Sequence, residues 1–188
     1  MTQRIFLRSL PWAFLGTVLC ALVYGAVQQD FRQTANDPQI QMAEDGASFL
    51  ARGIPPGNII PIRKSAFRKS LWPFMTVLDT EGKILATSIE DENPPVPPKE
   101  TLEYAERWGM NRITWEPETG VRHATIIVPY YTSAASSTAG YVIAGRSLRE
   151  IEKREANLMS QVSLAWLIAL LGTFLLVWFR ERHSHRTA

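Results

Sequence analysis

Six side chains in the middle of the chain are of the types that small-molecule binding sites use. A pocket of this kind combines aromatic walls with a few placed polar groups, and an arginine can hold a carboxylate through two parallel hydrogen bonds. Each aromatic side chain would also suit a packed core, and Arg122 would also suit an ion pair with a neighbouring glutamate. The candidate ligand-binding residues are Arg68, Trp72, Phe74, Trp115, Arg122 and Tyr130.

Catalytic chemistry has little support in the same sequence. It contains no Gly-x-Ser-x-Gly motif, no glycine loop of the phosphate-binding type, and no set of histidines or cysteines at metal-ligand spacing. His123 is the only histidine between the two apolar segments described below. A lone histidine in a strand is more often structural than catalytic. We therefore predict a protein that is not an enzyme and that uses no metal or other cofactor.

The elements that would position these residues lie between two uncharged stretches. Residues 10–27 and 162–179 contain no Asp, Glu, Lys or Arg. At about 1.5 Å per residue, each helix would nearly cross the roughly 30 Å hydrocarbon layer of a bilayer. We predict transmembrane helices at residues 10–27 and 161–179, so the lipid bilayer is one expected partner. For the first stretch, cleavage as a signal peptide remains an alternative, because it follows a charged start.

The distribution of charge predicts the topology. Arginines flank the outer ends of both apolar stretches, which by the positive-inside rule places both termini, residues 1–9 and 180–188, in the cytoplasm. Five arginines and one glutamate give these tails +4, so the net charge of +2 leaves −2 for the middle. A slightly acidic domain has no general attraction for nucleic acid. The predicted location is an inner (cytoplasmic) membrane, with residues 28–160 forming an extracytoplasmic domain.

The patterns of the middle region predict a mixed α+β domain. A helix over residues 28–52 is interrupted at Pro38, and a short helix over residues 101–108 is stopped by Gly109. Residues 79–82 suit a tight hairpin turn with Gly82 at positive φ. Runs of strand-forming residues predict five strands, at residues 74–78, 83–88, 112–116, 121–131 and 141–145.

The exit from the domain has a helix-start signal. Ser147 and Glu150 form a capping box, in which each side chain satisfies a free backbone N–H at the start of a helix. The chain then meets no proline or glycine until Gly172. We therefore expect one unbroken helix from the last strand into the second membrane segment, able to pass a movement of that strand to the membrane.

Three segments carry a resemblance to a known family: FMTVLDTEGKILATS at residues 74–88, HATIIVPYY at 123–131 and GYVIAGRSLREIE at 140–152. With the flanking helices, they resemble the extracytoplasmic single-Cache (PAS-like) sensor domains of bacterial receptors. The resemblance covers residues 28–160. It implies an antiparallel sheet of about five strands with a long N-terminal helix, small metabolites bound on one sheet face, and terminal helices that shift relative to the membrane.

One departure from that family matters. Its receptors continue into a kinase, cyclase or methyl-accepting domain, whereas only nine residues follow Phe179 here. Two functions are therefore expected. The first is a sensor-like module for signal transduction that binds a small molecule and acts through a membrane signalling partner. The alternative is a ligand-free interaction or scaffold protein, with a homodimer as one form of assembly.

Overall fold

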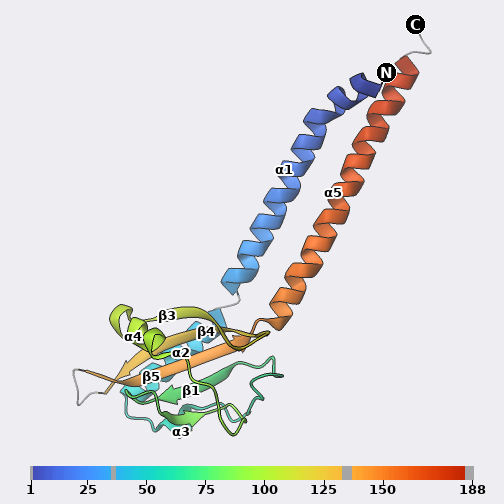
Figure 1. Cartoon of the computed structure of the whole chain (residues 1–188). Helices are drawn as coiled ribbons and strands as arrows, with labels where there is room; N and C mark the ends of the chain where they lie inside the picture. Colours follow the sequence, from blue (N-terminus) through green and yellow to red (C-terminus); the bar gives the residue numbers. More distant parts are fainter. Residues whose placement is uncertain (1, 35–36, 133–136, 185–188) are drawn as a thin grey trace. The chain divides into compact units, whose positions relative to one another are not determined.

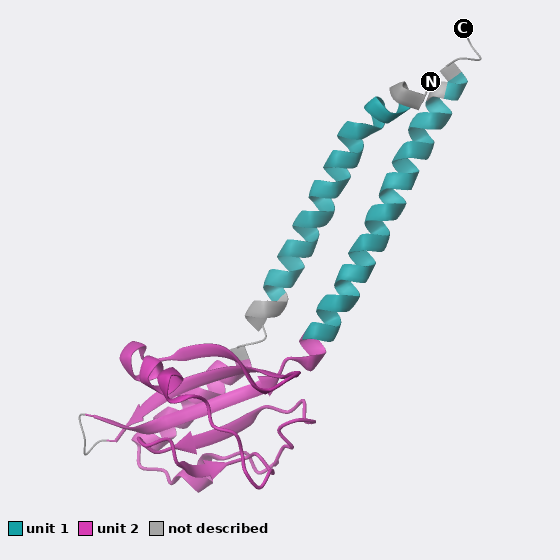
Figure 2. Ribbon diagram, in the orientation of Figure 1, with its two compact units in different colours: residues 1–32, 152–188 teal, residues 33–151 magenta. Residues whose placement is uncertain are grey.

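The computed structural model describes residues 2–34, 37–132 and 137–184. It contains five helices and five strands within these residues (Figure 1). The chain divides into two compact units, residues 1–32 with 152–188 and residues 33–151 (Figure 2). The elements in chain order are α1 (Thr2–Thr34), α2 (Asp37–Ala51), α3 (Pro56–Ile59), β1 (Phe74–Leu78), β2 (Ile84–Thr87), α4 (Lys99–Trp108), β3 (Asn111–Glu118), β4 (Val121–Tyr131), β5 (Thr138–Ser147) and α5 (Arg149–Ser184).

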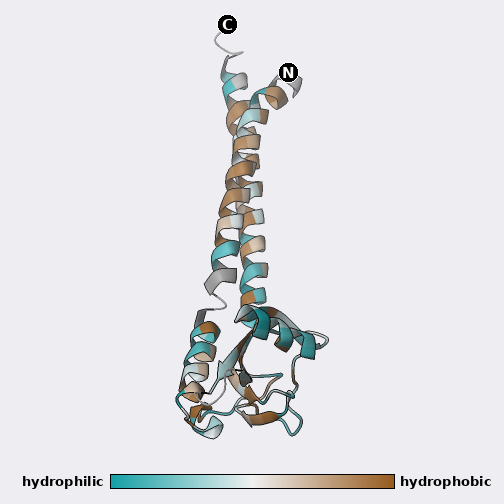
Figure 3. Cartoon of the chain, turned by 90° about the vertical axis from the view of Figure 1, so that its left-hand side faces the viewer, coloured by the Kyte–Doolittle hydropathy of each residue, from teal (hydrophilic) through white to brown (hydrophobic). Residues whose placement is uncertain are grey.

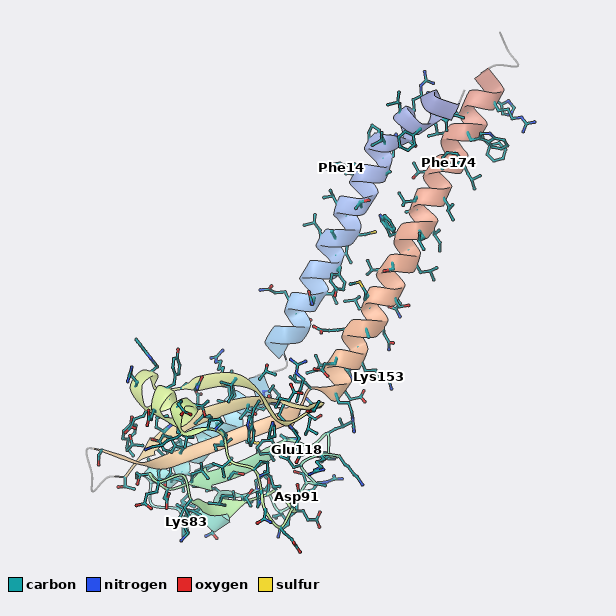
Figure 4. All side chains as sticks on the ribbon, in the orientation of Figure 1. Phe14, Lys83, Asp91, Glu118, Lys153 and Phe174 are labelled. Atoms are coloured by element: carbon teal, nitrogen blue, oxygen red, sulfur yellow. The ribbon has the colours of Figure 1, made fainter. Side chains whose placement is uncertain are left out.

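The first unit consists of α1 and most of α5. Ile5–Asp30 and Arg149–Arg180 are long and apolar enough to cross a membrane, by length and composition alone. Apolar residues predominate along the middle turns of both helices (Figure 3). Phe14 and Phe174 project from their helices and are largely exposed (Figure 4). Trp166 Nε1 donates a hydrogen bond to Thr17 Oγ1 at 2.9 Å, from α5 to α1.

The second unit is built on a five-stranded antiparallel sheet, which confirms the α+β class. The strand order is β2-β1-β5-β4-β3, so β5 lies in the middle of the sheet. The bounds of β1 and β4 agree with the predicted strands. β5 is longer than predicted at both ends, because its residues from Thr138 to Ser147 pair with the long strand β4. The predicted turn is confirmed, with Gly82 at φ 86°.

One face of the sheet packs against α2, which contacts β4 and β5 (Figure 1). The sheet contributes Met75, Val77, Ile126, Val128, Tyr130, Val142 and Ala144 to this α2 face, and the helix contributes Ala43, Ala47 and Leu50. The helix comes close because Gly46 has no side chain: a Cβ there would lie 3.1 Å from both Met75 Cε and Val142 Cγ1. Burial of each valine or isoleucine stabilises the fold by about 1.5–3 kcal/mol.

The opposite face packs against α4 and the loop that carries Phe67. Successive strand residues point to opposite sides of a sheet. The strand residues that alternate with those of the α2 face therefore supply this second face, called the α4 face below. Its core consists of Phe67, Phe74, Leu78, Ile89, Leu102, Ala105, Trp115, Ile127, Tyr141 and Ile143.

The start of α5 differs from the predicted capping box. Ser147 is the last residue of β5, and its Oγ accepts a hydrogen bond from the backbone N–H of Arg149 at 3.4 Å. The contact falls one residue before the expected one at Glu150, because Ser147 is held in the sheet opposite His123. The helix itself is continuous from Arg149 to Ser184, so only Leu148 separates it from β5.

Candidate functional site

A small pocket opens on the α4 face of the sheet. It is formed where the β1–β2 turn, the proline-rich loop and the first turns of α4 meet. Its volume is about 140 Å³, below the roughly 300–1,000 Å³ of pockets for drug-sized ligands. At about 30 Å³ per water molecule, it has the volume of four or five waters. The lining residues are Thr80, Glu81, Gly82, Val96, Pro97, Lys99, Leu102, Glu103 and Tyr141.

Tyr141 is the pocket residue contributed by the middle of the sheet. It lies on β5 opposite Leu78 and is only 4% exposed. Its hydroxyl donates a hydrogen bond to Glu106 Oε2 at 3.1 Å. Burial raises the pKa of Tyr141 to about 12, helped by this hydrogen bond and by the negative charges of Glu106 and Glu103. The hydroxyl is therefore neutral at physiological pH, and its oxygen keeps a lone pair that can accept a further hydrogen bond.

The rim of the pocket carries both signs of charge. The carboxylate of Asp79 fixes the β1–β2 turn by accepting hydrogen bonds from the backbone N–H groups of Glu81 at 2.9 Å and Lys83 at 2.8 Å. Across the pocket, Lys99 Nζ lies 3.7 Å from Glu103 Oε1 on exposed side chains. The charged lining groups are the carboxylates of Glu81 and Glu103 and the ammonium group of Lys99, and such a rim suits a small polar compound better than a purely apolar one.

The other end of the same face is filled by an aromatic cluster centred on Phe67. Its ring centroid lies 5.3 Å from that of Phe74 and 5.4 Å from that of Trp115. It also stacks on the imidazole of His123 at 4.2 Å. Thr125 follows two residues after His123 on β4, and both side chains are buried.

The structure brings together only two of the six predicted ligand contacts. Phe74 and Trp115 are linked through Phe67 in the aromatic cluster. Tyr130 is buried on the α2 face, so it lies on the opposite side of the sheet from them.

The remaining three candidates are exposed. Arg68 forms an ion pair with Glu118 at 2.7 Å, and Glu118 is labelled in Figure 4. Trp72 is 55% exposed and lies under the guanidinium of Arg63 at 4.2 Å. Arg122 pairs with Glu116 at 3.7 Å, one of the two alternatives expected for it.

Sequence reasoning missed the residues of the pocket. Tyr141 and Ile143 alternate with Val142 and Ala144, a pattern that places the tyrosine on one face with Phe74. Nothing in the sequence, however, showed that Lys99 and Glu103 of α4 would come to lie beside it. That proximity follows from the packing of α4, which contacts β3 and β4.

Within the described residues, no group of three or more His, Cys, Asp and Glu side chains is arranged to hold a metal ion. In comparisons with known proteins, no family model and no curated protein matches the chain.

Proposed function

We propose that this protein is a membrane-anchored sensor-like module that binds a small polar molecule on the α4 face of its sheet and acts through a membrane partner. The single observation that carries the proposal is the pocket beside Tyr141. It combines a buried, hydrogen-bonded tyrosine with charged groups from the β1–β2 turn and from α4. The proposal includes no catalytic step.

The connection between sheet and helix supports the signalling part of the proposal. Tyr141 belongs to β5, and α5 begins two residues after β5 ends. A ligand that shifts Tyr141 would therefore act on the strand that continues into an apolar helix. The resemblance to single-Cache sensor domains is consistent with this route, in which a partner with its own output domain would respond to α5.

The proposed topology places both termini in the cytoplasm of a bacterium and residues 28–160 outside it. It can be tested with single cysteines in a Cys20→Ser background. Asp91→Cys is at an exposed position of the loop after β2 (Figure 4), and His183→Cys is near the end of α5. In intact cells, a membrane-impermeant maleimide should label position 91 and should label position 183 only after lysis. The reverse pattern would reject the topology.

Ligand binding can be tested with the full chain in lipid nanodiscs, by a thermal-shift screen of small polar metabolites. Val96→Trp would place a large ring at the pocket rim, and Leu85→Trp is a matched change at an exposed residue of β2. A true pocket ligand should raise the Tm of the wild type and of Leu85→Trp but not that of Val96→Trp. Identical shifts in all three proteins would argue against the pocket.

A ligand-free interaction or scaffold protein is the second candidate function. It is favoured by the aromatic cluster, in which the protein's own Phe67 fills much of the α4 face. A homodimer is one form of this function. Crosslinking in native membranes would show a partner for such a protein, and detection of monomers alone would reject it.

A further inference from the structure

The end of the α4 face under Phe67 holds two buried polar atoms without hydrogen-bond partners. Among the described residues, four buried side-chain atoms have no partner: Nε2 and Oε1 of Gln39 in α2, and His123 Nδ1 and Thr125 Oγ1, which both lie on β4. Burying such a group without a partner destabilises the folded state. A face made for packing alone would avoid this cost with valine at position 125, as Ile126 and Val128 do on the α2 side of β4.

The two atoms belong to one site. His123 and Thr125 are two residues apart on β4, so their side chains leave the same face of the sheet, about 6.5–7 Å apart along the strand. Thr125 pairs with Gly145 on the next strand, and the Phe74 ring occupies the space that a side chain at Gly145 would take. A Cβ at Gly145 would lie 2.6 Å from Phe74 Cε1 and 3.1 Å from Thr125 Oγ1. Phe74 therefore forms the wall of the site next to the hydroxyl.

The protonation state of His123 defines what this site could recognise. Its Nε2 lies 3.1 Å from the carbonyl oxygen of Phe67, which can only accept a hydrogen bond. Nε2 therefore carries the proton, and Nδ1 presents a lone pair. Burial lowers the pKa of His123 and favours the neutral ring, while backbone hydrogen-bond interactions with Phe67 and Val121 oppose that shift. The Val121 interaction falls short of hydrogen-bond geometry, so Nδ1 has no partner in the described part of the chain. The site offers an acceptor at Nδ1 and a hydroxyl that can donate or accept.

Phe67 occupies this site from a loop. It precedes β1 in a segment that belongs to no strand, anchored upstream by hydrogen bonds between Ser65 and the backbone of Ser88 and Glu90. The ring can leave without breaking a hydrogen bond of the five-stranded ladder. The contacts that oppose its departure are those with the Phe74, Trp115 and His123 rings.

We propose that Phe67 is a displaceable plug over a second ligand site, whose ligand is a flat aromatic compound bearing an O–H or N–H donor. Such a ring would take the place of Phe67 between Phe74, Trp115 and the imidazole. Its donor would supply the hydrogen bond that His123 Nδ1 lacks, with Thr125 Oγ1 as a second partner. The site is separate from the pocket beside Tyr141, because none of its residues lines that pocket.

Phenol and toluene form a matched pair of probes, because they share a shape and differ in the hydroxyl. We would titrate each into the full chain in lipid nanodiscs and follow the ¹⁵N signal of His123 Nδ1, assigned by comparison with His123→Gln. Phenol should move this signal saturably toward the hydrogen-bonded range, and toluene should not. Phe67→Ala should lower the half-saturating phenol concentration roughly tenfold, because displacement of the plug no longer opposes binding. Phe67→Leu serves the same comparison if the alanine variant does not fold.

Three results would overturn the inference. The first is a His123 signal that phenol leaves unchanged in the wild type and in both Phe67 variants. The second is an equal response to toluene, which would indicate an apolar cavity only. The third is an Nδ1 signal already in the hydrogen-bonded range before any probe is added. A ligand of the pocket beside Tyr141 would leave His123 unchanged, so failure here would not bear on the proposed function.

Discussion

The two faces of one sheet differ in what they bury. The α2 face is lined mainly by aliphatic side chains, together with Tyr130 and the buried amide of Gln39, and a glycine in α2 lets the helix approach closely. The α4 face contains four aromatic core residues, a buried histidine and threonine, and a pocket with charged groups at its rim. Buried polar atoms without partners reduce stability, and they occur at Gln39 of α2 as well as at His123 and Thr125 of β4. The aromatic cluster and the pocket are what distinguish the α4 face, and they make it the side to search for function.

The largest expected effect comes from two neighbouring isoleucines on opposite faces. Ile126 faces α2, Ile127 faces α4, and both are fully buried. Each Ile→Ala substitution should reduce the free energy of unfolding by about 2–5 kcal/mol. Chemical unfolding of the full chain, followed by tryptophan fluorescence, measures the loss. Only Ile127→Ala should also change ligand or phenol binding, and an equal effect of Ile126→Ala on binding would break the distinction between the faces.

Two glycines give the next largest contrast. Gly145→Ala would push against the Phe74 ring on the α4 face, and overpacking of this kind costs about 1–3 kcal/mol. Gly46→Ala on the α2 side meets only the tips of Met75 and Val142, and alanine is favoured over glycine in a helix by up to about 1 kcal/mol. The unfolding free energy should therefore fall clearly for Gly145→Ala and little for Gly46→Ala. Equal losses would show that both faces are packed equally tightly.

A smaller effect is expected at Tyr141 and depends on pH. Since its pKa in the folded protein is about 12 and its ordinary value is 10, the unfolded chain releases this proton first. Stability from Tyr141 is therefore complete below pH 10 and is lost as the pH rises from 10 toward 12. The Tyr141→Phe variant should not show the decrease in unfolding free energy that ionisation of this hydroxyl causes above pH 10. At neutral pH the substitution should lower the unfolding free energy by about 0.5–1.5 kcal/mol, because the hydrogen bond is lost. Parallel pH profiles for the two proteins would contradict the assigned environment.

The smallest effect separates two buried threonines. Thr76 Oγ1 lies 2.8 Å from Thr87 Oγ1, whereas Thr125 Oγ1 has no partner among the described residues. Thr76→Val should reduce the unfolding free energy by about 0.5–1.5 kcal/mol, while Thr125→Val should leave it unchanged or raise it. Thermal unfolding of both variants measures the difference. A clear loss for Thr125→Val would mean that its hydroxyl is already satisfied in the folded protein.

The sequence by itself determined the local elements of this protein. The bounds of β1 and β4, the turn at Gly82, the end of α4 at Gly109 and the unbroken course of α5 follow from signals between residues close in the chain. Strand formers, glycine at positive φ and the absence of helix breakers act over a few residues, so these features can be predicted without knowledge of the fold. The two long apolar stretches follow from composition in the same way.

Only the tertiary structure decided which side chains meet. Alternation along β4 separates Tyr130 from Tyr131, but it does not say which helix covers either face. Phe74 and Tyr130 were both candidate contacts, and the register of β1 and β4 against β5 placed them on opposite sides of the sheet. Tyr141 meets Glu106, and Phe67 meets His123, across 35 and 56 residues of chain. Contacts at such separations depend on how β5 inserts between β1 and β4, which no local pattern specifies.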